Sequence, residues 1–334
     1  MPSVIRRAFL ATAASAALAW SAPSLAQTTL LNVSYDVARE FYKDYNAAFA
    51  KHWKATAGED IKLNQSHGGS SKQARAVIDG LEADVLTMNQ ALDIDMVADK
   101  GLIAADWAKR LPNNAAPTSS ITVIMVRKGN PKAIKDWPDL TKPGVSVIIP
   151  NPKITGNGRY TYLAAWGSAI KAGGTPVQAR DLVQKIFANV PVFDGGGRAA
   201  TTTFAQRKIG DALVTFESEV QSIIEEFGKD YDIVYPKSTI LAENPVALVD
   251  KVVDKKGTRK QADAYLKWLW SDEAQAIAVK HNLRPRNEKL LAQNATLFPK
   301  VTTFTVDEVF GGWRKAQSEH FNDGGVYDQV VQRR

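Results

Sequence analysis

The chain has 334 residues and no cysteine, so neither a disulfide bond nor a thiolate metal site can form. Histidine is scarce, and no two histidines have the spacing of a metal-binding helix. The four are His52, His67, His281 and His320. No calcium-loop spacing occurs either. We therefore expect no metal and no cofactor.

Nucleotide-binding and nucleic-acid-binding signals are also missing. No lysine follows the glycine-rich stretches with the spacing of a P-loop. The formal charge of +7 is spread over interspersed acids and bases, and no basic run alternates with aromatic residues. This pattern indicates a solvated surface and excludes nucleic acid as a partner.

A catalytic serine lacks its usual setting. Residues 66–70 (Ser-His-Gly-Gly-Ser) superficially resemble an esterase oxyanion loop, but no Gly-x-Ser-x-Gly nucleophile elbow exists in the chain. We expect the protein not to be an enzyme, with an exported hydrolase as the alternative.

The first 26 residues have the pattern of a secretory signal peptide. Arg6 and Arg7 precede an apolar run at residues 8–20, and Ser24-Leu25-Ala26 forms a small-residue cleavage site. The apolar run is too short and too rich in alanine for a membrane span. The pattern predicts export, to a bacterial periplasm, of a chain that begins near Gln27.

The remaining chain alternates strand and helix patterns, which predicts an α/β fold with mainly parallel sheets flanked by helices. Its length suffices for two cores of ~150 residues each. A strong strand at residues 120–127 and another at 245–249 are the expected crossings between two lobes. We therefore assign residues 1–26 to the signal peptide, 27–117 to lobe 1, 118–244 to lobe 2, and 245–334 to lobe 1 again.

Residues 151–159 (Asn-Pro-Lys-Ile-Thr-Gly-Asn-Gly-Arg), here called the central turn, join a predicted strand at 145–149 to a predicted helix at 160–172. Gly156 and Gly158 let the backbone point its N–H groups toward one place. The start of a helix also carries unpaired N–H donors and a partial positive charge. The central turn therefore has the features of an anion seat.

Similar strand-to-helix junctions occur at residues 65–71, at 194–198 (the third turn) and, more weakly, at 216–219. In parallel sheets such junctions meet at the carboxyl ends of the strands. Removing the water around an anion costs a large free energy, and each hydrogen bond from the protein to the anion offsets roughly 1.5–3 kcal/mol of it. The pattern predicts a small, fully ionised oxyanion bound by backbone donors from several turns.

Five motifs follow one another along the chain: residues 32–36 with Arg39-Glu40, 65–73, 151–153, 194–198 with 201–204, and 310–313. Together they resemble the periplasmic sulfate/thiosulfate-binding proteins of ABC importers. The resemblance implies a two-lobed periplasmic binding protein of type II, with the ligand in the cleft between the lobes and no metal. It also implies a monomer that delivers sulfate or thiosulfate to the membrane permease subunits of an importer.

The same resemblance implies which residues bind the ligand. Those in contact would lie at the starts of helices and are Asp36, Ser70, Thr155, Gly156, Asn157, Gly197 and Phe216. Most would offer a backbone N–H, and Ser70 also its hydroxyl. Those in support would be Gly69, Arg159 and Arg198, with direct contact by the two arginines as the alternative.

The chain departs from the family pattern at Phe216, where sulfate-specific members carry a tryptophan whose indole N–H reaches the ligand. Ile154 and Ala199 also replace the usual small residues. Phe216 cannot donate, and a terminal sulfur, as a weak acceptor, would lose less from that exchange than an oxygen. We therefore hypothesise that thiosulfate binds at least as well as sulfate. The alternatives are that Phe216 only packs, or that the ligand is another tetrahedral oxyanion such as molybdate.

Overall fold

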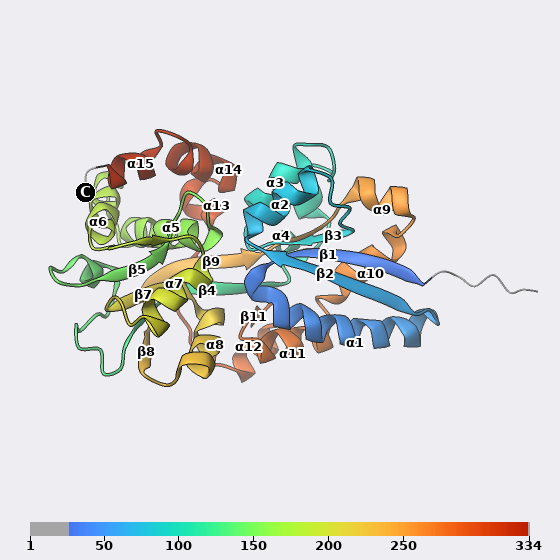
Figure 1. Ribbon diagram of the computed structural model, residues 1–334, viewed down its shortest axis with the longest axis horizontal. Helices are drawn as coiled ribbons and strands as arrows, with labels where there is room; N and C mark the ends of the chain where they lie inside the picture. Colours follow the sequence, from blue (N-terminus) through green and yellow to red (C-terminus); the bar gives the residue numbers. More distant parts are fainter. Residues whose placement is uncertain (1–26, 333–334) are drawn as a thin grey trace, which may run out of the picture.

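Two β-sheets, each with helices on both faces, divide the protein into two lobes (Figure 1). The computed structural model describes residues 27–332. The predicted signal peptide lies outside the described residues. Within residues 27–332, no helix combines the length and apolarity needed to cross a bilayer.

The first lobe is built on a four-stranded sheet in the order β10-β3-β1-β2. β1 runs parallel to β2 and β3, and only β10 is antiparallel. Its strands are β1 (Thr28–Tyr35), β2 (Ile61–Gly68), β3 (Val85–Thr87) and β10 (Val246–Leu248). Its helical segments are η1 (Asp36–Ala38), α1 (Arg39–Ala57), α2 (Ser70–Ile78), α3 (Ala91–Ala98), η2 (Trp107–Lys109), α4 (Pro112–Ala115), α9 (Asp250–Lys256), α10 (Arg259–Trp268) and α11 (Asp272–Lys280).

The second lobe is built on an eight-stranded sheet whose main path is β12-β9-β4-β7-β5-β6. Its strands are β4 (Thr118–Arg127), β5 (Val147–Pro150), β6 (Phe193–Asp194), β7 (Ala212–Phe216), β8 (Tyr231–Val234), β9 (Ser238–Asn244), β11 (Arg284–Pro285) and β12 (Thr302–Phe304). Its helical segments are η3 (Trp137–Thr141), α5 (Gly156–Lys171), α6 (Pro176–Ala188), α7 (Gly197–Thr201), η4 (Thr202–Gln206), α8 (Glu217–Phe227), α12 (Glu288–Gln293), α13 (Val306–Phe310), α14 (Trp313–Ala316), η5 (Gln317–Phe321) and α15 (Val326–Val331).

The second sheet is mixed rather than mainly parallel. β4 runs antiparallel to β7, β8, β9 and β11, because it enters from the first lobe against the direction of the neighbouring strands. β5, β6 and β7 remain parallel. The expected parallel arrangement therefore holds for the strands that carry the central and third turns.

The C-terminal segment differs from the expected assignment of residues 245–334 to lobe 1. β12 pairs in parallel with β9 of the second sheet. Phe304, Phe310 and Tyr327 then pack in the same hydrophobic cluster as Tyr160 of α5. Only the part through α11 stays with the first sheet, since burial of these C-terminal aromatic residues draws the last segment to the second lobe.

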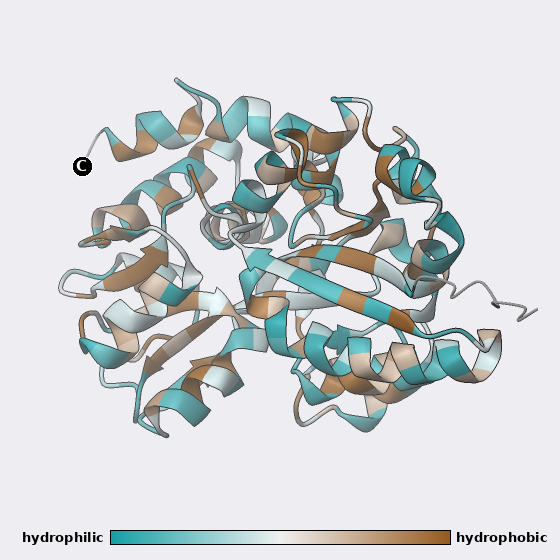
Figure 2. Ribbon diagram, turned by 45° about the vertical axis from the view of Figure 1, so that its right-hand side comes forward, coloured by the Kyte–Doolittle hydropathy of each residue, from teal (hydrophilic) through white to brown (hydrophobic). Residues whose placement is uncertain are grey.

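Side chains alternate between the two faces of each sheet. On β4, Ile124 and Val126 point into one core cluster, while Val123 and Met125 point into the other. This period of two is what a strand with helices on both faces requires. Figure 2 shows the hydrophobic residues gathered along such strands and on the inner sides of the helices.

Helix α5 is the buried axis of the second lobe. Every residue from position 156 to 168 is buried. At Gly167 an added Cβ would lie 2.2 Å from the ring of Phe304, so glycine allows β12 to pack directly on the helix. Because α5 is held on all sides, its first turn is fixed in place at the edge of the lobe.

Candidate functional site

A cavity of about 300 Å³ lies between the two lobes, and strand-to-helix junctions of both lobes line it. The residues from the first lobe are Tyr35, Asp36, Val37, Gly68, Gly69, Ser70 and Asn89. Those from the second lobe are Ile154, Thr155, Gly156, Asn157, Gly195, Gly196, Gly197, Arg198, Ala199, Phe216 and Glu219. The structure thus brings all seven residues predicted to contact the ligand to one cavity, together with Gly69 and Arg198. Their roles toward a ligand stay predictions.

The central turn leaves two backbone donors without a protein partner. Thr155 is the N-cap of α5, and its Oγ1 accepts a hydrogen bond from the Gly158 N–H at 3.0 Å. The Thr155 carbonyl accepts the Arg159 N–H at 3.1 Å. The N–H groups of Gly156 and Asn157 have no acceptor among residues 27–332, although both residues line the cavity. These two are the unpaired N–H groups with which a helix start binds an anion.

Both glycines of the central turn are closely packed, Gly158 against backbone and Gly156 against the end of a side chain. At Gly158 a Cβ would lie 2.4 Å from the Pro150 carbonyl oxygen, which is backbone and cannot move aside. At Gly156 a Cβ would lie 2.7 Å from Asn89 Oδ1 of the first lobe. The two lobes therefore meet here, and Asn89 Oδ1 has no hydrogen-bond partner in the described part of the chain.

Ser70 offers a buried hydroxyl from the first lobe. It is the first residue of α2, and its Oγ makes a hydrogen bond to the Asp93 carboxylate and two longer contacts. These are 3.4 Å to Met88 Sδ and 3.5 Å from the Asn89 N–H. The two longer contacts are weak hydrogen bonds, so a ligand would compete for the single hydroxyl proton mainly with Asp93.

The third turn presents more donors with less support. α7 begins at Gly197 after an extended Gly196, which offers no side-chain cap. Over the described range, the N–H groups of Gly197, Arg198 and Ala199 have no acceptor. No atom lies within 4 Å of a Cβ built at Gly195 or Gly196. The third turn is therefore open where the central turn is packed.

The two predicted supporting arginines have different environments. Arg159 is buried and does not line the cavity; its Nη2 donates to the Lys153 carbonyl at 3.2 Å and its Nη1 to Ser71 Oγ of the first lobe at 3.4 Å. Burial lowers the pKa of Arg159, and the nearby Asp93 carboxylate opposes this shift. Arg198 has a side chain that is 76% exposed and lies 3.4 Å from Glu226.

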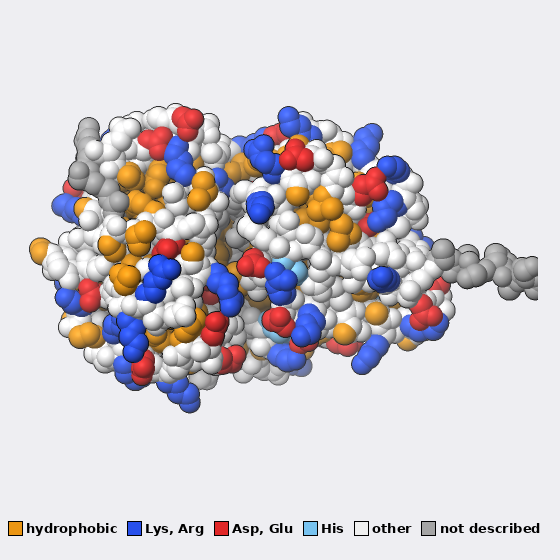
Figure 3. All heavy atoms as spheres, viewed as in Figure 1, with side chains coloured by type: hydrophobic (Ala, Val, Ile, Leu, Met, Phe, Trp, Pro, Cys, Tyr) orange, Lys and Arg blue, Asp and Glu red, His pale blue; other side chains and the backbone are white. Residues whose placement is uncertain are grey.

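The mouth of the cleft is mixed in charge. A second cavity of about 450 Å³ beside the first is lined by Arg39 and Glu40 of one lobe and by Arg198 and Glu226 of the other. Figure 3 shows the furrow between the lobes with charged side chains of both signs along it. Entry to the cleft therefore carries no strong field of one sign.

Phe216 both packs and borders the cavity. It is buried, its ring meets the edge of Tyr160 with the ring centroids 5.5 Å apart, and it is the residue before α8. Its ring gives the cavity an apolar stretch of wall. The geometry is compatible with both interpretations of this residue.

Sequence reasoning missed Asn89 and Glu219. Glu219 is buried and accepts a hydrogen bond from Thr215 Oγ1 at 2.8 Å. Burial raises its pKa to about 7, against hydrogen bonds from Thr215 and Asn157 that lower it. Asn89 follows the carboxyl end of β3, and Glu219 follows that of β7. Because ligands bind at the carboxyl ends of strands in such sheets, these positions could have identified both residues from the sequence.

The alternative hydrolase chemistry has no assembled dyad at His67. Its Nδ1 lies 3.2 Å from the Tyr35 carbonyl oxygen, and its Nε2 contacts the Gln65 side chain. The neighbouring Ser66 Oγ instead accepts from Gln73 Nε2 at 3.0 Å. In the described part of the chain, no group of three or more His, Asp or Glu side chains could hold a metal ion.

Comparison with known proteins gives consistent matches over most of the chain. Residues 30–284 match the family described as bacterial extracellular solute-binding protein. The thiosulfate-binding protein of Pseudomonas aeruginosa is 60% identical over 98% of this chain and 99% of its own length. The sulfate-binding protein of Escherichia coli is 52% identical over 91% of this chain and 93% of its own. Among solved structures, the sulfate-binding protein SubI of Mycobacterium tuberculosis is 29% identical, with a TM-score of 0.78 over 89% of this chain and 100% of that one.

Proposed function

Because the chain belongs to the family of bacterial extracellular solute-binding proteins, we propose that it captures sulfate or thiosulfate and delivers it to an ABC importer. The observation that carries this proposal is the set of free backbone N–H groups, from separate turns, around one cavity. The described residues provide no cation that both lines the cavity and is buried. A small oxyanion is the ligand that this set of backbone N–H donors suits.

The number of donors is sufficient for useful affinity. Gly156 and Asn157 contribute one N–H each, the third turn contributes up to three, and the Ser70 hydroxyl adds another. At about 1.5–3 kcal/mol for each hydrogen bond to a charged group, five or six of them supply the ~8 kcal/mol of micromolar binding after part of the dehydration cost is met.

Thiosulfate should bind at least as well as sulfate, because Phe216 replaces a donor with an apolar wall. Phosphate should bind poorly. Near neutral pH hydrogen phosphate still carries an O–H, which the N–H donors of the turns cannot accept and which costs roughly 1–3 kcal/mol if it stays unpaired. Binding of phosphate as tight as that of sulfate would indicate that Asn89 Oδ1, which lines the cavity without a partner among the described residues, accepts this O–H. Glu219 does not change this expectation as long as its carboxyl group stays bonded to Thr215 and Asn157.

The cellular setting follows from the same proposal. The chain is exported to the periplasm, works as a monomer without enzymatic activity, and passes its ligand to membrane permease subunits. Its lobes divide near residues 117 and 245, with the segment from β11 onward added to the second lobe.

Calorimetric titration with sulfate, thiosulfate, molybdate and phosphate tests the choice of ligand. We expect binding of the first two at micromolar concentration or below and no displacement by millimolar phosphate at pH 8. Sulfate bound ten times more tightly than thiosulfate would remove the role given to Phe216. Hydrolysis of chromogenic esters without any anion binding would favour the hydrolase instead.

A matched pair of variants tests the donors. Gly156 is the first residue of α5, where proline suits the helix and follows an extended Thr155 without strain. Gly156→Pro removes the N–H, whereas Gly156→Ala keeps it and places a similar Cβ against Asn89. We expect the proline variant to bind at least tenfold more weakly than the alanine variant. Equal affinity of the two would show that this N–H does not contact the ligand.

A further inference from the structure

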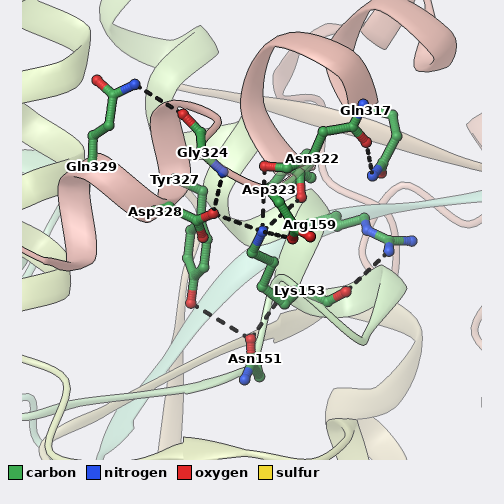
Figure 4. A network of polar contacts seen from close by, with 11 residues as sticks. Asn151, Lys153, Arg159, Gln317, Asn322, Asp323, Gly324, Tyr327, Asp328 and Gln329 are labelled. Atoms are coloured by element: carbon green, nitrogen blue, oxygen red, sulfur yellow. Dashed lines mark hydrogen bonds and ion pairs between the residues drawn. The ribbon is translucent and has the colours of Figure 1, made fainter.

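Lys153 lies at the back of the central turn and contacts the C-terminal segment of the chain (Figure 4). Its Nζ is 2.9 Å from Asp328 Oδ2 and 3.2 Å from Asp323 Oδ1. The same atom donates to the carbonyl oxygens of Phe321 at 3.0 Å and Asn322 at 3.3 Å. These carbonyls lie at the end of η5, where helix carbonyls lack partners within the helix. The three N–H donors of one ammonium group are therefore shared among four acceptors of the C-terminal segment.

The ion pair of Lys153 and Asp328 is partly shielded from water, whereas the Asp323 carboxylate is fully exposed. The side chains of Lys153 and Asp328 are 25% and 21% exposed. Burial alone would lower the pKa of Lys153, but the Asp328 and Asp323 carboxylates raise it. Asp328 Oδ2 also accepts the Gly324 N–H at 2.8 Å, so the loop between η5 and α15 is tied to the same carboxylate. Both partners thus remain charged near neutral pH and hold each other in one arrangement.

Lys153 is fastened to the turn through its backbone as well. Its N–H donates to Asn151 Oδ1 at 2.9 Å, and its carbonyl accepts from Arg159 Nη2 at 3.2 Å. The Asn151 carbonyl in turn accepts both the N–H and the Oγ1 hydroxyl of Thr155, at 3.0 and 2.8 Å. Asn151 therefore connects Lys153 to Thr155, the residue that caps α5, through hydrogen bonds to both.

We propose that Lys153 is a positioning residue for anion binding. By fastening the central turn to residues 321–328, it fixes the direction of the free Gly156 and Asn157 N–H groups before a ligand arrives. Lys153 does not line the cavity, so its charge acts on the turn rather than on the anion. The inference rests on the proposed function, because it concerns how the same donors are held. Donors fixed in advance lose less entropy when they bind.

The test compares Lys153→Met with Lys128→Met. Lys128 follows β4 in the same lobe and forms its own ion pair, with Nζ 2.6 Å from Asp232 Oδ1, but it lies outside the cavity and the turn. We expect Lys153→Met to bind sulfate at least tenfold more weakly, through faster release, and Lys128→Met to stay within twofold of the parent. Urea unfolding of both variants measures the loss of stability separately.

Amide hydrogen exchange of the ligand-free proteins supplies a second readout. The Gly158 and Arg159 N–H groups are bonded to Thr155, so their exchange reports the order of the central turn. We expect faster exchange at these two amides in Lys153→Met and no change in Lys128→Met. Exchange and affinity equal to those of the control would overturn the positioning role.

A second variant covers the case in which Lys153→Met does not fold. Asp328→Asn keeps the lysine and removes its main carboxylate, and we expect faster exchange at Gly158 with an affinity between those of parent and Lys153→Met. Unchanged values in Asp328→Asn would also overturn the proposal. If the parent itself binds no anion, the proposed function fails, while the exchange comparison still decides whether Lys153 orders the turn.

Discussion

The central turn and the third turn offer the same kind of donor but differ in how they are held. The central turn is capped by Thr155, packed at Gly158 against the Pro150 carbonyl, and braced by Lys153. The third turn has no side-chain cap, open space around Gly195 and Gly196, and an exposed arginine. The second lobe therefore has one rigid turn and one adaptable turn at the cavity. We expect the rigid turn to set the position of the anion and the adaptable turn to close on anions of different size.

The same substitution in the two turns should have the most unequal effects. Gly158→Ala forces a Cβ to within 2.4 Å of backbone, whereas Gly196→Ala meets nothing within 4 Å and its φ of 177° suits any residue. We expect a loss of at least 100-fold in affinity, about 3 kcal/mol, for Gly158→Ala, and less than twofold for Gly196→Ala. Calorimetry on both measures it. Similar losses at the two positions would break the comparison.

Glu219 connects the two turns and should make the stability of the ligand-free protein depend on pH. It receives a hydrogen bond from Asn157, and its carboxyl oxygens lie about 3.5 Å from a Cβ built at Gly197. Its pKa is raised from 4.5 to about 7, so it stabilises the fold at pH values below 4.5 and this contribution is lost as the pH rises through 7.

The free energy of unfolding of the parent should therefore fall relative to that of Glu219→Gln by about 2 kcal/mol between pH 5 and 7.5. Urea denaturation at both pH values measures the difference, and using the difference cancels other titrating groups such as His320. Parallel pH profiles of parent and variant would place the ionised carboxylate in a less buried setting than the structure has.

Loss of the Thr155 hydroxyl should have a smaller effect, confined to the central turn. Thr155→Val keeps the shape but removes the acceptor for the Gly158 N–H. We expect about 1 kcal/mol lower stability and a severalfold weaker affinity. Thr202→Val, whose hydroxyl donates to the Arg198 carbonyl behind the third turn, serves as the control and should leave affinity within twofold.

Arg198 should matter least. Its side chain is 76% exposed and its contact with Glu226 is 3.4 Å long, so solvent and salt screen its charge. We expect Arg198→Gln to change affinity by less than threefold at 0.15 M salt and by even less at 0.5 M. A tenfold loss that persists at high salt would indicate that the guanidinium contacts the anion directly.

The sequence predicted the junctions because glycine-rich turns follow β-branched strands in a recognisable order. The sequence pattern, however, predicted the start of the helix after the central turn several residues beyond its position in the structure. The predicted helix at 160–172 begins at Gly156 in the structure. Glycine has a low helix propensity, so local patterns exclude it from a helix, whereas capping by Thr155 and burial of α5 include it. This shift of a few residues decides which N–H groups are free.

Long-range contacts were beyond the sequence. β12 has three residues and pairs with β9, which lies about 60 positions earlier, so no local pattern assigns it to the second sheet. Asn89 reaches Gly156 only because the lobes meet, and the raised pKa of Glu219 depends on burial that the fold creates. Backbone donors could be placed from turn chemistry, but the side chains that surround them required the tertiary structure.

The separation between Lys153 and Asp328, 175 positions along the chain, bears on when the protein matures. A polypeptide becomes available from its N-terminus, and the strands and helices around residue 153 can form while the end of the chain is still being made or exported. The last support of the central turn arrives only with residues 321–328. Early fragments of this chain can therefore acquire most of the second lobe's secondary structure and still lack the contacts that hold the central turn in place.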